Sequence, residues 1–158
     1  MMLQVGDKAP KFETVDESGN NFRLNDHLGT KLVLYFYPKD ETPGCTAEAC
    51  SIRDNYQTFQ EAGIPVYGIS GGSTESHQRF KEKYDLPFPL LIDEDNEIAK
   101  LYHAYSKLSV IGLGVKRITY LIDEQGEIEG IFGGSAGEEG VKSSQHAEQI
   151  AGFWGLKL

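Results

Sequence analysis

Apolar side chains gather in short runs and in helical stripes along the chain, and their spacing predicts alternating strands and helices. The most apolar run covers residues 32–37, where leucine, valine and aromatic residues follow one another without alternation. Such continuity is typical of a central strand that is buried on both faces of a sheet. Apolar or small residues then recur at steps of four and three, which predicts an amphipathic helix over residues 45–60, ended by Gly63 and Pro65. Its buried stripe would consist of Cys45, Ala49, Ile52, Tyr56 and Phe59.

The same order of strand and helix continues toward the C-terminus. Further strands are predicted over residues 64–69, 90–92, 117–123 and 127–132, and further helices over residues 73–84, 96–105 and 143–153. Asp-Glu-Gln-Gly joins the last two strands as a hairpin with Gly126 at its turn. Residues 12–24 predict a small hairpin around Ser18-Gly19-Asn20, and residues 108–115 read as a loop.

This order of elements predicts the α/β class, with a central mixed β-sheet flanked by helices and a small N-terminal β-hairpin as an extension. The length suits one domain with a substantial hydrophobic core. No repeat, low-complexity tract or long linker separates a second unit, so residues 1–158 are expected to form one domain.

The net charge of the chain limits the classes of partner that it is expected to bind. Lysine and arginine number 15 against 24 aspartate and glutamate residues, a formal net charge of −9. This field repels nucleic acid and anionic membrane surfaces, so a small or neutral substrate and a protein partner are expected. The start of the chain lacks the pattern of a signal peptide, and no stretch approaches the roughly 20 apolar residues of a membrane span. We therefore expect a cytoplasmic protein.

Only two cysteines occur, Cys45 and Cys50. A structural disulfide framework uses more cysteines and closes longer loops. A zinc site needs further ligands, and the four histidines are scattered without metal-ligand spacing. The sequence therefore predicts neither a metal nor a cofactor, and the cysteine pair needs another explanation.

Thr42-Pro43-Gly44-Cys45 is a strong signal for the start of a helix. Thr42 suits the N-cap, and Pro43 suits the first helical position because its missing N–H has no partner there. Cys45 would then lie in the first turn, where unpaired N–H groups and the helix dipole favour the reactive thiolate. Gly44 leaves the approach to the thiol open. The apolar stripe makes this position partly dry, so an added positive charge is needed to keep the thiol ionised.

The spacing of Cys45 and Cys50 limits how they can pair. Residues five apart on a helix are separated by about 140° around the axis and roughly 8–9 Å between Cα atoms. Disulfides rarely bridge more than about 7 Å between Cα atoms. Either the two cysteines never pair, or the first turns of the helix unwind when they do. As an alternative to pairing, Cys50 could simply fill space beside Ala49.

The residues around this helix start resemble a known family. Pro38, Thr42, Cys45 and Glu48 match the Pro-x-x-x-Thr-x-x-Cys-x-x-Glu pattern of peroxiredoxins. Residues 35–38 and 42–50 look like the bacterioferritin comigratory protein subfamily, also called the Q type, and the likeness continues through residues 68–70, 90–93 and 117–123. It spans nearly the whole chain. His103 stands where the family usually has glycine, and Gly71 where aspartate is common.

The resemblance implies a thioredoxin-like fold and a peroxidase that reduces hydrogen peroxide and organic hydroperoxides. The thiolate of Cys45 would attack the peroxide and become a sulfenic acid, which the Cys50 thiol would convert to an intramolecular disulfide. By the helix geometry, this second step requires local unwinding. A thioredoxin-like dithiol would restore both thiols. Because no third cysteine offers an intersubunit disulfide, a monomer is expected.

The resemblance also implies roles for the supporting residues. Thr42 would hydrogen-bond the substrate oxygen, and Pro38 would shield the pocket. Arg117 would stabilise the thiolate and the developing oxyanion, with the Cys45 backbone N–H as a second donor. Glu48 would orient a neighbouring side chain by hydrogen bonding.

Two other classes of function compete with this interpretation. A general thiol–disulfide oxidoreductase usually carries Cys-x-x-Cys, whereas four residues separate Cys45 from Cys50 here. A non-catalytic thioredoxin-like module that binds a partner protein would not need a helix-start cysteine, a threonine and an arginine together.

Overall fold

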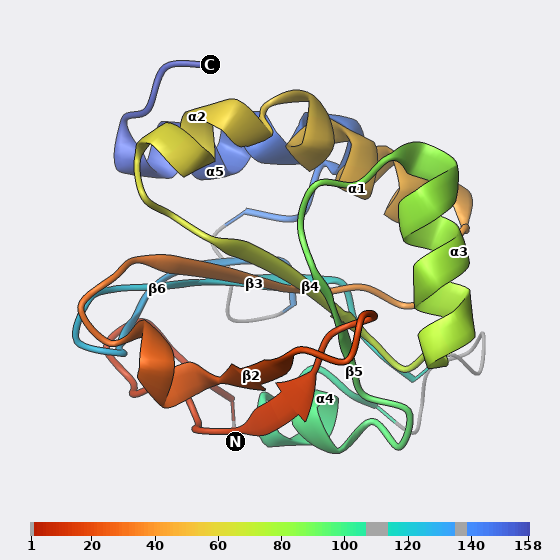
Figure 1. Ribbon diagram of the computed structural model, residues 1–158. Helices are drawn as coiled ribbons and strands as arrows, with labels where there is room; N and C mark the ends of the chain where they lie inside the picture. The colour runs from red at the N-terminus through yellow and green to blue at the C-terminus, as the bar shows by residue number, and fades with distance from the viewer. Residues whose placement is uncertain (1, 107–113, 135–138) are drawn as a thin grey trace.

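A five-stranded sheet runs through the centre of the computed structural model, which describes residues 2–106, 114–134 and 139–158 (Figure 1). Most of the loop predicted over 108–115 lies outside the described residues. The strands are β1 (Glu13–Val15), β2 (Asn21–Arg23), β3 (Leu32–Phe36), β4 (Val66–Ser70), β5 (Leu90–Ile92), β6 (Ile118–Ile122) and β7 (Ile128–Phe132). The α-helices are α1 (Pro43–Asp54), α2 (Tyr56–Glu61), α3 (Thr74–Tyr84), α4 (Glu97–Leu101) and α5 (His146–Trp154), and two 3₁₀ turns are η1 (Leu24–His27) and η2 (Ser143–Gln145).

The order of strands in the sheet is β5-β4-β3-β6-β7. Strand β3 lies at the centre, parallel to β4 and antiparallel to β6, which confirms the predicted mixed sheet. All five residues of β3 are buried, as its unbroken apolar run predicted. Leu34 and Phe36 face one hydrophobic core, whereas Val33 and Tyr35 face the other.

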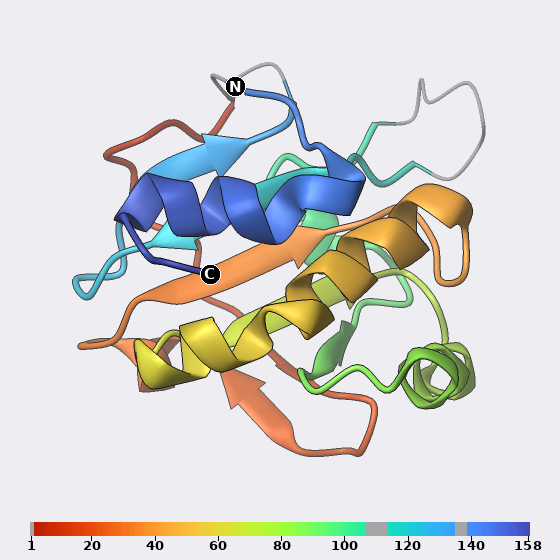
Figure 2. The ribbon, with the colours of Figure 1, turned by 90° about the horizontal axis from the view of Figure 1, so that it is seen from above.

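Helices cover both faces of the sheet (Figures 1 and 2). The pair α1 and α2 lies beside α5 on one face, with α3 at the end of that layer. The predicted N-terminal hairpin, β1 with β2, lies on the opposite face together with η1 and α4. The chain leaves the end of β3 through a short loop into α1, so the start of α1 lies over the edge of the sheet where β3 ends.

The helix predicted over 45–60 is interrupted at Asn55, which separates α1 from α2. The Asn55 side-chain amide donates to the Ser51 carbonyl oxygen at 2.9 Å. In a continuous helix that oxygen would accept the backbone N–H of Asn55. The N–H bonds instead to the carbonyl oxygen of Ile52 at 3.2 Å. The prediction of one continuous helix was therefore wrong, because this side chain competes with the backbone.

Helix α4 is shorter than the helix predicted over 96–105. His103 stops it by adopting a φ of 57°, in the left-handed region. Its N–H donates to the Lys100 carbonyl oxygen at 3.1 Å, and the Ala104 N–H donates to the Ala99 carbonyl oxygen at 2.7 Å. This pair of bonds is a Schellman motif, whose left-handed position usually holds glycine. The histidine itself gave no signal for the end of the helix, although the resembled family usually has glycine at this position.

We expect His103→Gly to raise the free energy of unfolding by about 1 kcal/mol, because glycine adopts a positive φ without the steric cost that a Cβ brings. The His103 side chain is exposed, so little packing is lost. Urea unfolding measures the change. His103→Ala keeps the Cβ and should match the native chain. Equal stability of the glycine and alanine variants would contradict this account.

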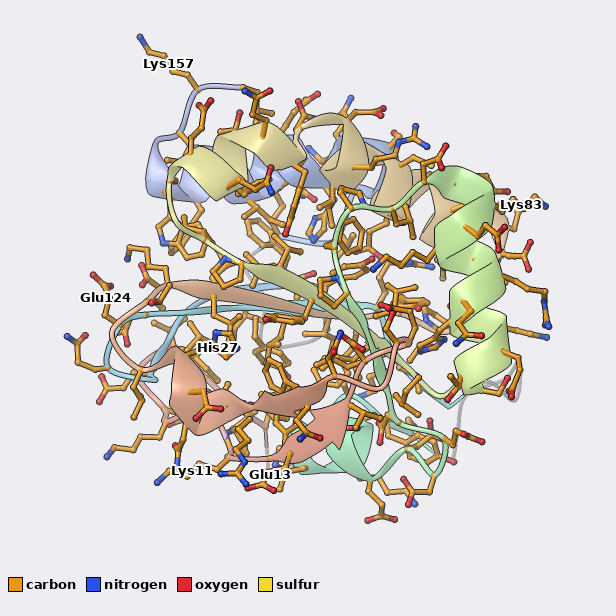
Figure 3. All side chains as sticks on the ribbon, viewed as in Figure 1. Lys11, Glu13, His27, Lys83, Glu124 and Lys157 are labelled. Carbon is orange, nitrogen blue, oxygen red and sulfur yellow. The ribbon has the colours of Figure 1, made fainter. Side chains whose placement is uncertain are left out.

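Many charged side chains lie on the outside of the molecule. Lys83 on α3, Glu124 in the turn after β6 and Lys157 near the C-terminus all point away from the ribbon (Figure 3). Among the residues that the structure describes, no helix is both long and apolar enough to cross a bilayer.

Candidate active site

Cys45 lies in the first turn of α1 and is 1% exposed. Pro43 opens the helix at the predicted position. The thiol belongs to the core between the sheet and the helices, on the same stripe as Ala49, Ile52 and Phe59. The expected setting is therefore confirmed: a helix start in a largely dry surrounding.

Thr42 occupies the N-cap position with an extended backbone, but its side chain makes no capping bond. Its hydroxyl donates instead to the carbonyl oxygen of Lys39 at 3.0 Å. The predicted side-chain cap was therefore wrong: the hydroxyl is directed to the preceding loop, and no backbone N–H of α1 donates to its oxygen. The lone pairs of the Thr42 oxygen remain available to a group that approaches Cys45.

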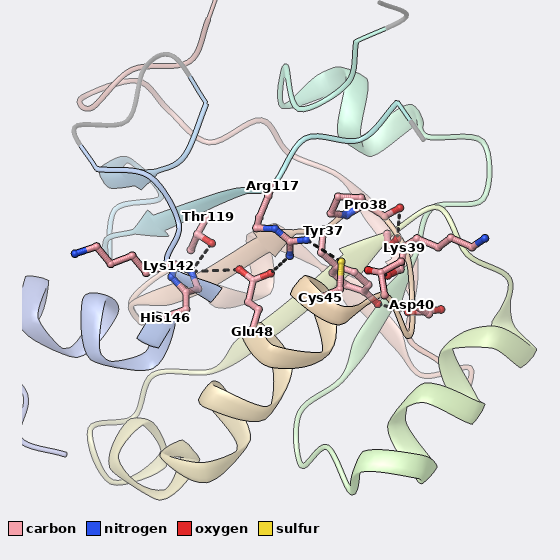
Figure 4. A network of polar contacts seen from close by, with 12 residues as sticks. Tyr37, Pro38, Lys39, Asp40, Cys45, Glu48, Arg117, Thr119, Lys142 and His146 are labelled. Carbon is pink, nitrogen blue, oxygen red and sulfur yellow. Dashed lines mark hydrogen bonds and ion pairs between the residues drawn. The ribbon is translucent and has the colours of Figure 1, made fainter. Parts of the chain in front are cut away.

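Arg117 supplies the positive charge that the thiol was expected to need. It immediately precedes β6, and its Nη2 lies 3.1 Å from the Sγ of Cys45 (Figure 4). Its Nη1 donates to Glu48 Oε1 at 2.7 Å, so one guanidinium bridges the thiol and the carboxyl. Burial alone would lower the pKa of Arg117, but the adjacent Glu48 and Cys45 raise it. Arg117 therefore stays charged.

The absence of a side chain at Gly44 makes room for the contact between Arg117 and Cys45. A Cβ on Gly44 would lie 3.1 Å from Nη2 of Arg117, so a larger residue would push the guanidinium away. Pro38 follows β3 at the end that faces Cys45, and its carbonyl oxygen accepts a bond of 3.5 Å from the Ser70 hydroxyl (Figure 4). The structure thus brings Gly44, Arg117 and Cys45 together, with Pro38 beside them.

Glu48 lies one turn after Cys45 and is completely buried. Burial raises the pKa of its carboxyl to about 7, although the Arg117 charge opposes that shift. The carboxyl is therefore close to half-protonated at neutral pH. Its hydrogen bond with Arg117 is a contact of the kind that the orienting role expected from the motif would use.

A histidine and a threonine that the sequence patterns did not single out complete this network. His146, the first residue of α5, is fully buried, and its Nε2 lies 2.7 Å from Thr119 Oγ1 and 3.5 Å from Glu48 Oε2 (Figure 4). Its Nδ1 lies 2.8 Å from Gln149 Oε1. Burial lowers the pKa of His146 to about 4, so the ring is neutral at neutral pH.

A second buried carboxylate, Asp40, ties the loop before α1 to α3. It accepts the Tyr37 hydroxyl at 2.6 Å and the Ser76 hydroxyl at 2.7 Å, and His77 Nδ1 lies 2.7 Å from it. Burial would raise the pKa of Asp40, but these hydrogen bonds, led by the one from His77, lower it. His77 Nε2 bonds in turn to the Leu91 carbonyl oxygen at 3.1 Å. These contacts hold the segment between β3 and Cys45 in place.

Cys50 lies in the same intact helix as Cys45, is partly exposed, and forms no disulfide. Just beyond it, tertiary hydrogen bonds hold α1. The Ser51 hydroxyl accepts the Ala147 backbone N–H at 3.0 Å, and Arg53 Nη1 donates to the Tyr84 carbonyl oxygen at 2.7 Å. The helix is therefore anchored to α5 and α3 from Ser51 onward.

Peroxiredoxins are similar to this chain in sequence and in fold. The AhpC/TSA family matches residues 5–131. A putative peroxiredoxin Bcp of Coxiella burnetii is 42% identical over 155 residues, or 96% of this chain and 99% of the relative. Peroxiredoxin Bcp of Escherichia coli K12 is 40% identical over 151 residues, 94% of this chain and 93% of the relative. The bacterioferritin comigratory protein of Xanthomonas campestris, solved to study its alkyl peroxide reduction, aligns with a TM-score of 0.80 at 30% identity, covering 90% of this chain and 88% of that one.

The sequence similarity and the structural similarity each span nearly all of the chain. The structural neighbours have the thioredoxin fold, which confirms the expected fold class. The chain therefore belongs to the AhpC/TSA family, among its Bcp/PrxQ peroxiredoxins, and is a thiol-dependent peroxidase.

Proposed function

We propose that Cys45 is the peroxidatic thiol and Cys50 its resolving partner, in a cycle that reduces hydrogen peroxide and organic hydroperoxides. The observation that carries this proposal is the guanidinium of Arg117, which lies 3.1 Å from the Cys45 sulfur. A cation at hydrogen-bonding distance stabilises the thiolate, the form that attacks peroxides. The alkyl peroxide reduction of the Xanthomonas campestris relative supports a substrate range that includes organic hydroperoxides.

In the first step, the Cys45 thiolate attacks one oxygen of the peroxide and the O–O bond breaks. The sulfur gains that oxygen as a sulfenic acid, and the other oxygen leaves as hydroxide or alkoxide, which takes a proton from solvent to become water or an alcohol. Arg117 stabilises the charge that develops on the departing oxygen. Thr42 accepts a hydrogen bond from the peroxide, because its own proton is directed to Lys39. Pro38 limits the entry of water.

In the second step, the Cys50 thiol displaces the sulfenic oxygen as water and forms a disulfide with Cys45. The helix between them must unwind first, since their separation on an intact helix exceeds the reach of a disulfide. The anchors at Ser51 and Arg53 support unwinding that is confined to the turns before them. A thioredoxin-like dithiol then reduces the disulfide and is itself oxidised. Because both cysteines lie in one chain, we propose that a monomer suffices.

Cys50→Ser provides the test of this cycle. With a thioredoxin system, the native chain should consume peroxide continuously. The variant should consume one equivalent and then stop, because its sulfenic acid has no partner thiol. A sulfenic-acid probe should label Cys45 at that stage, and thioredoxin should not restore it.

Each other outcome has a definite meaning. Continuous turnover by Cys50→Ser would leave a one-cysteine mechanism and make Cys50 a packing residue. A native chain that consumes no peroxide would support a binding module instead. Ser51→Ala, which removes the neighbouring anchor and keeps both thiols, should still turn over and serves as the control.

A further inference from the structure

The two oxygens of the Glu48 carboxyl differ sharply in their surroundings. Oε1 accepts the Arg117 hydrogen bond of 2.7 Å. Oε2 is buried and has no hydrogen-bond partner among the residues that the structure describes. A buried, ionised oxygen without a donor is costly. The polar atom that faces it, at 3.5 Å, is Nε2 of His146.

The hydrogen bonds of Gln149 determine which nitrogen of His146 carries the proton. The Lys142 backbone N–H donates to Gln149 Oε1 at 2.9 Å, and Gln149 Nε2 donates to the Gly140 carbonyl oxygen at 2.9 Å. The amide therefore presents its oxygen to His146 Nδ1, which must donate. In the neutral ring, Nε2 is then a lone-pair acceptor, and it receives the Thr119 hydroxyl at 2.7 Å.

It follows that His146 turns an acceptor nitrogen, already occupied by the Thr119 hydroxyl, toward Glu48 and offers it no hydrogen. An ionised Oε2 would be buried against this nitrogen with no donor, and protonation of Glu48 removes that cost. We propose that His146 is a positioning residue that keeps a proton on Glu48 and so leaves the charge of Arg117 to the Cys45 thiolate. This inference rests on the proposed function, because it concerns the state in which Cys45 reacts.

The charges around Glu48 explain why its proton matters. Among the described residues, Arg117 before β6 and His146 on α5 lie against Glu48, and the charges of Glu48 and of Cys45 on α1 both act on Tyr35 of β3. His146 is neutral, and burial raises the pKa of Tyr35 well above its usual value, so Tyr35 is neutral too. The Arg117 guanidinium thus contacts two acidic groups, the Glu48 carboxyl and the Cys45 thiol. If Glu48 and Cys45 were both ionised, they would repel each other and share one guanidinium.

His146→Gln should reverse this arrangement, because its amide N–H can donate to Glu48 Oε2 and favour the carboxylate. The rate of Cys45 oxidation by hydrogen peroxide should then fall about tenfold below pH 7. A tenfold change corresponds to about 1.4 kcal/mol of added repulsion between the carboxylate and the thiolate. Above pH 7, Glu48 is ionised in the native chain as well, because its pKa is about 7. The two rates should therefore converge there.

Three controls separate this effect from simple misfolding. His146→Asn retains an amide that can reach Gln149 but places no donor beside Glu48, so its pH profile should keep the native shape. His103→Gln changes an exposed histidine and should alter nothing. In a Glu48→Gln background, His146→Gln should no longer cause a pH-dependent loss. A loss of equal size at every pH would mean a structural role and would overturn the proposal.

A second measurement does not depend on peroxidase activity. Below pH 7, the infrared spectrum of the native chain should contain the C=O band of a buried protonated carboxyl. The band should disappear in Glu48→Gln and in His146→Gln, but remain in His146→Asn. If the native chain reduces peroxide and the band is absent, the role of His146 is wrong. If the band is present and the native chain reduces no peroxide, the proposed function fails instead.

Discussion

Replacement of Cys45 by serine is expected to lower the rate of peroxide consumption by a factor of about 1,000 or more. In the proposed cycle the Cys45 thiolate is the nucleophile, whereas a serine hydroxyl stays protonated at neutral pH even beside Arg117. Serine nearly matches cysteine in volume, and the site is 1% exposed, so the fold should persist. Stopped-flow measurement of peroxide loss with a thioredoxin system gives the rate.

The matched variant is Cys50→Ser, which makes the same chemical change five residues further along the helix. It should still react with the first equivalent of peroxide at nearly the native rate. Circular dichroism of both variants checks that the helices are retained. If Cys45→Ser consumed peroxide as fast as the native chain, Cys45 could not be the attacking thiol.

The second largest effect is expected for Arg117→Gln, which should slow the first oxidation of Cys45 about 100-fold at neutral pH. The substitution removes the cation 3.1 Å from the sulfur and leaves the Glu48 carboxyl without its partner. The oxidation rate of Arg117→Lys should lie between those of the native chain and Arg117→Gln, because one ammonium cannot hold the thiol and the carboxyl in the forked geometry of a guanidinium. Thiolate absorbance in the ultraviolet should fall in the same order.

Arg23→Gln is the control for this series. Arg23 lies on the N-terminal hairpin, and its side chain is 61% exposed beside Glu13. Its loss should leave the oxidation rate unchanged. A rate for Arg117→Gln within about threefold of the native rate would contradict the electrostatic role of Arg117, since removing a preorganised donor typically costs far more.

The elements of this fold were predictable where local pattern decides them. The apolar run over β3 and the proline-opened start of α1 both appear where the sequence placed them. The misses occurred where side chains compete with the backbone or strain it. The Asn55 side chain donates to the carbonyl oxygen that its own backbone N–H would bind in a continuous helix. His103 adopts a backbone conformation that favours glycine. Neither choice changes the hydrophobic period, so the pattern of the chain contained no sign of them.

The residues of the candidate site likewise divide into those that the sequence predicted and those that only the structure revealed. Cys45, Thr42 and Glu48 lie within seven residues and could be read as one motif, and Arg117 followed from the family resemblance. His146 and Thr119 reach the site only because α5 packs against α1 and β6 pairs with β3. The pairing of Asp40 with His77 likewise depends on where α3 lies. Such contacts between distant segments are set by tertiary packing, which one sequence does not reveal.

In the proposed cycle, the hydrogen bonds at Ser51 and Arg53 limit how much of α1 opens when Cys50 reaches Cys45. With the helix held from Ser51 onward, an opening that lets Cys50 reach Cys45 breaks about two turns and leaves the rest of α1 folded. Until that opening occurs, the sulfenic acid is exposed to a second peroxide, which would convert it to a sulfinic acid that thiols do not reduce. In that cycle, the frequency at which these two helical turns open would determine the peroxide concentration at which the enzyme begins to inactivate itself.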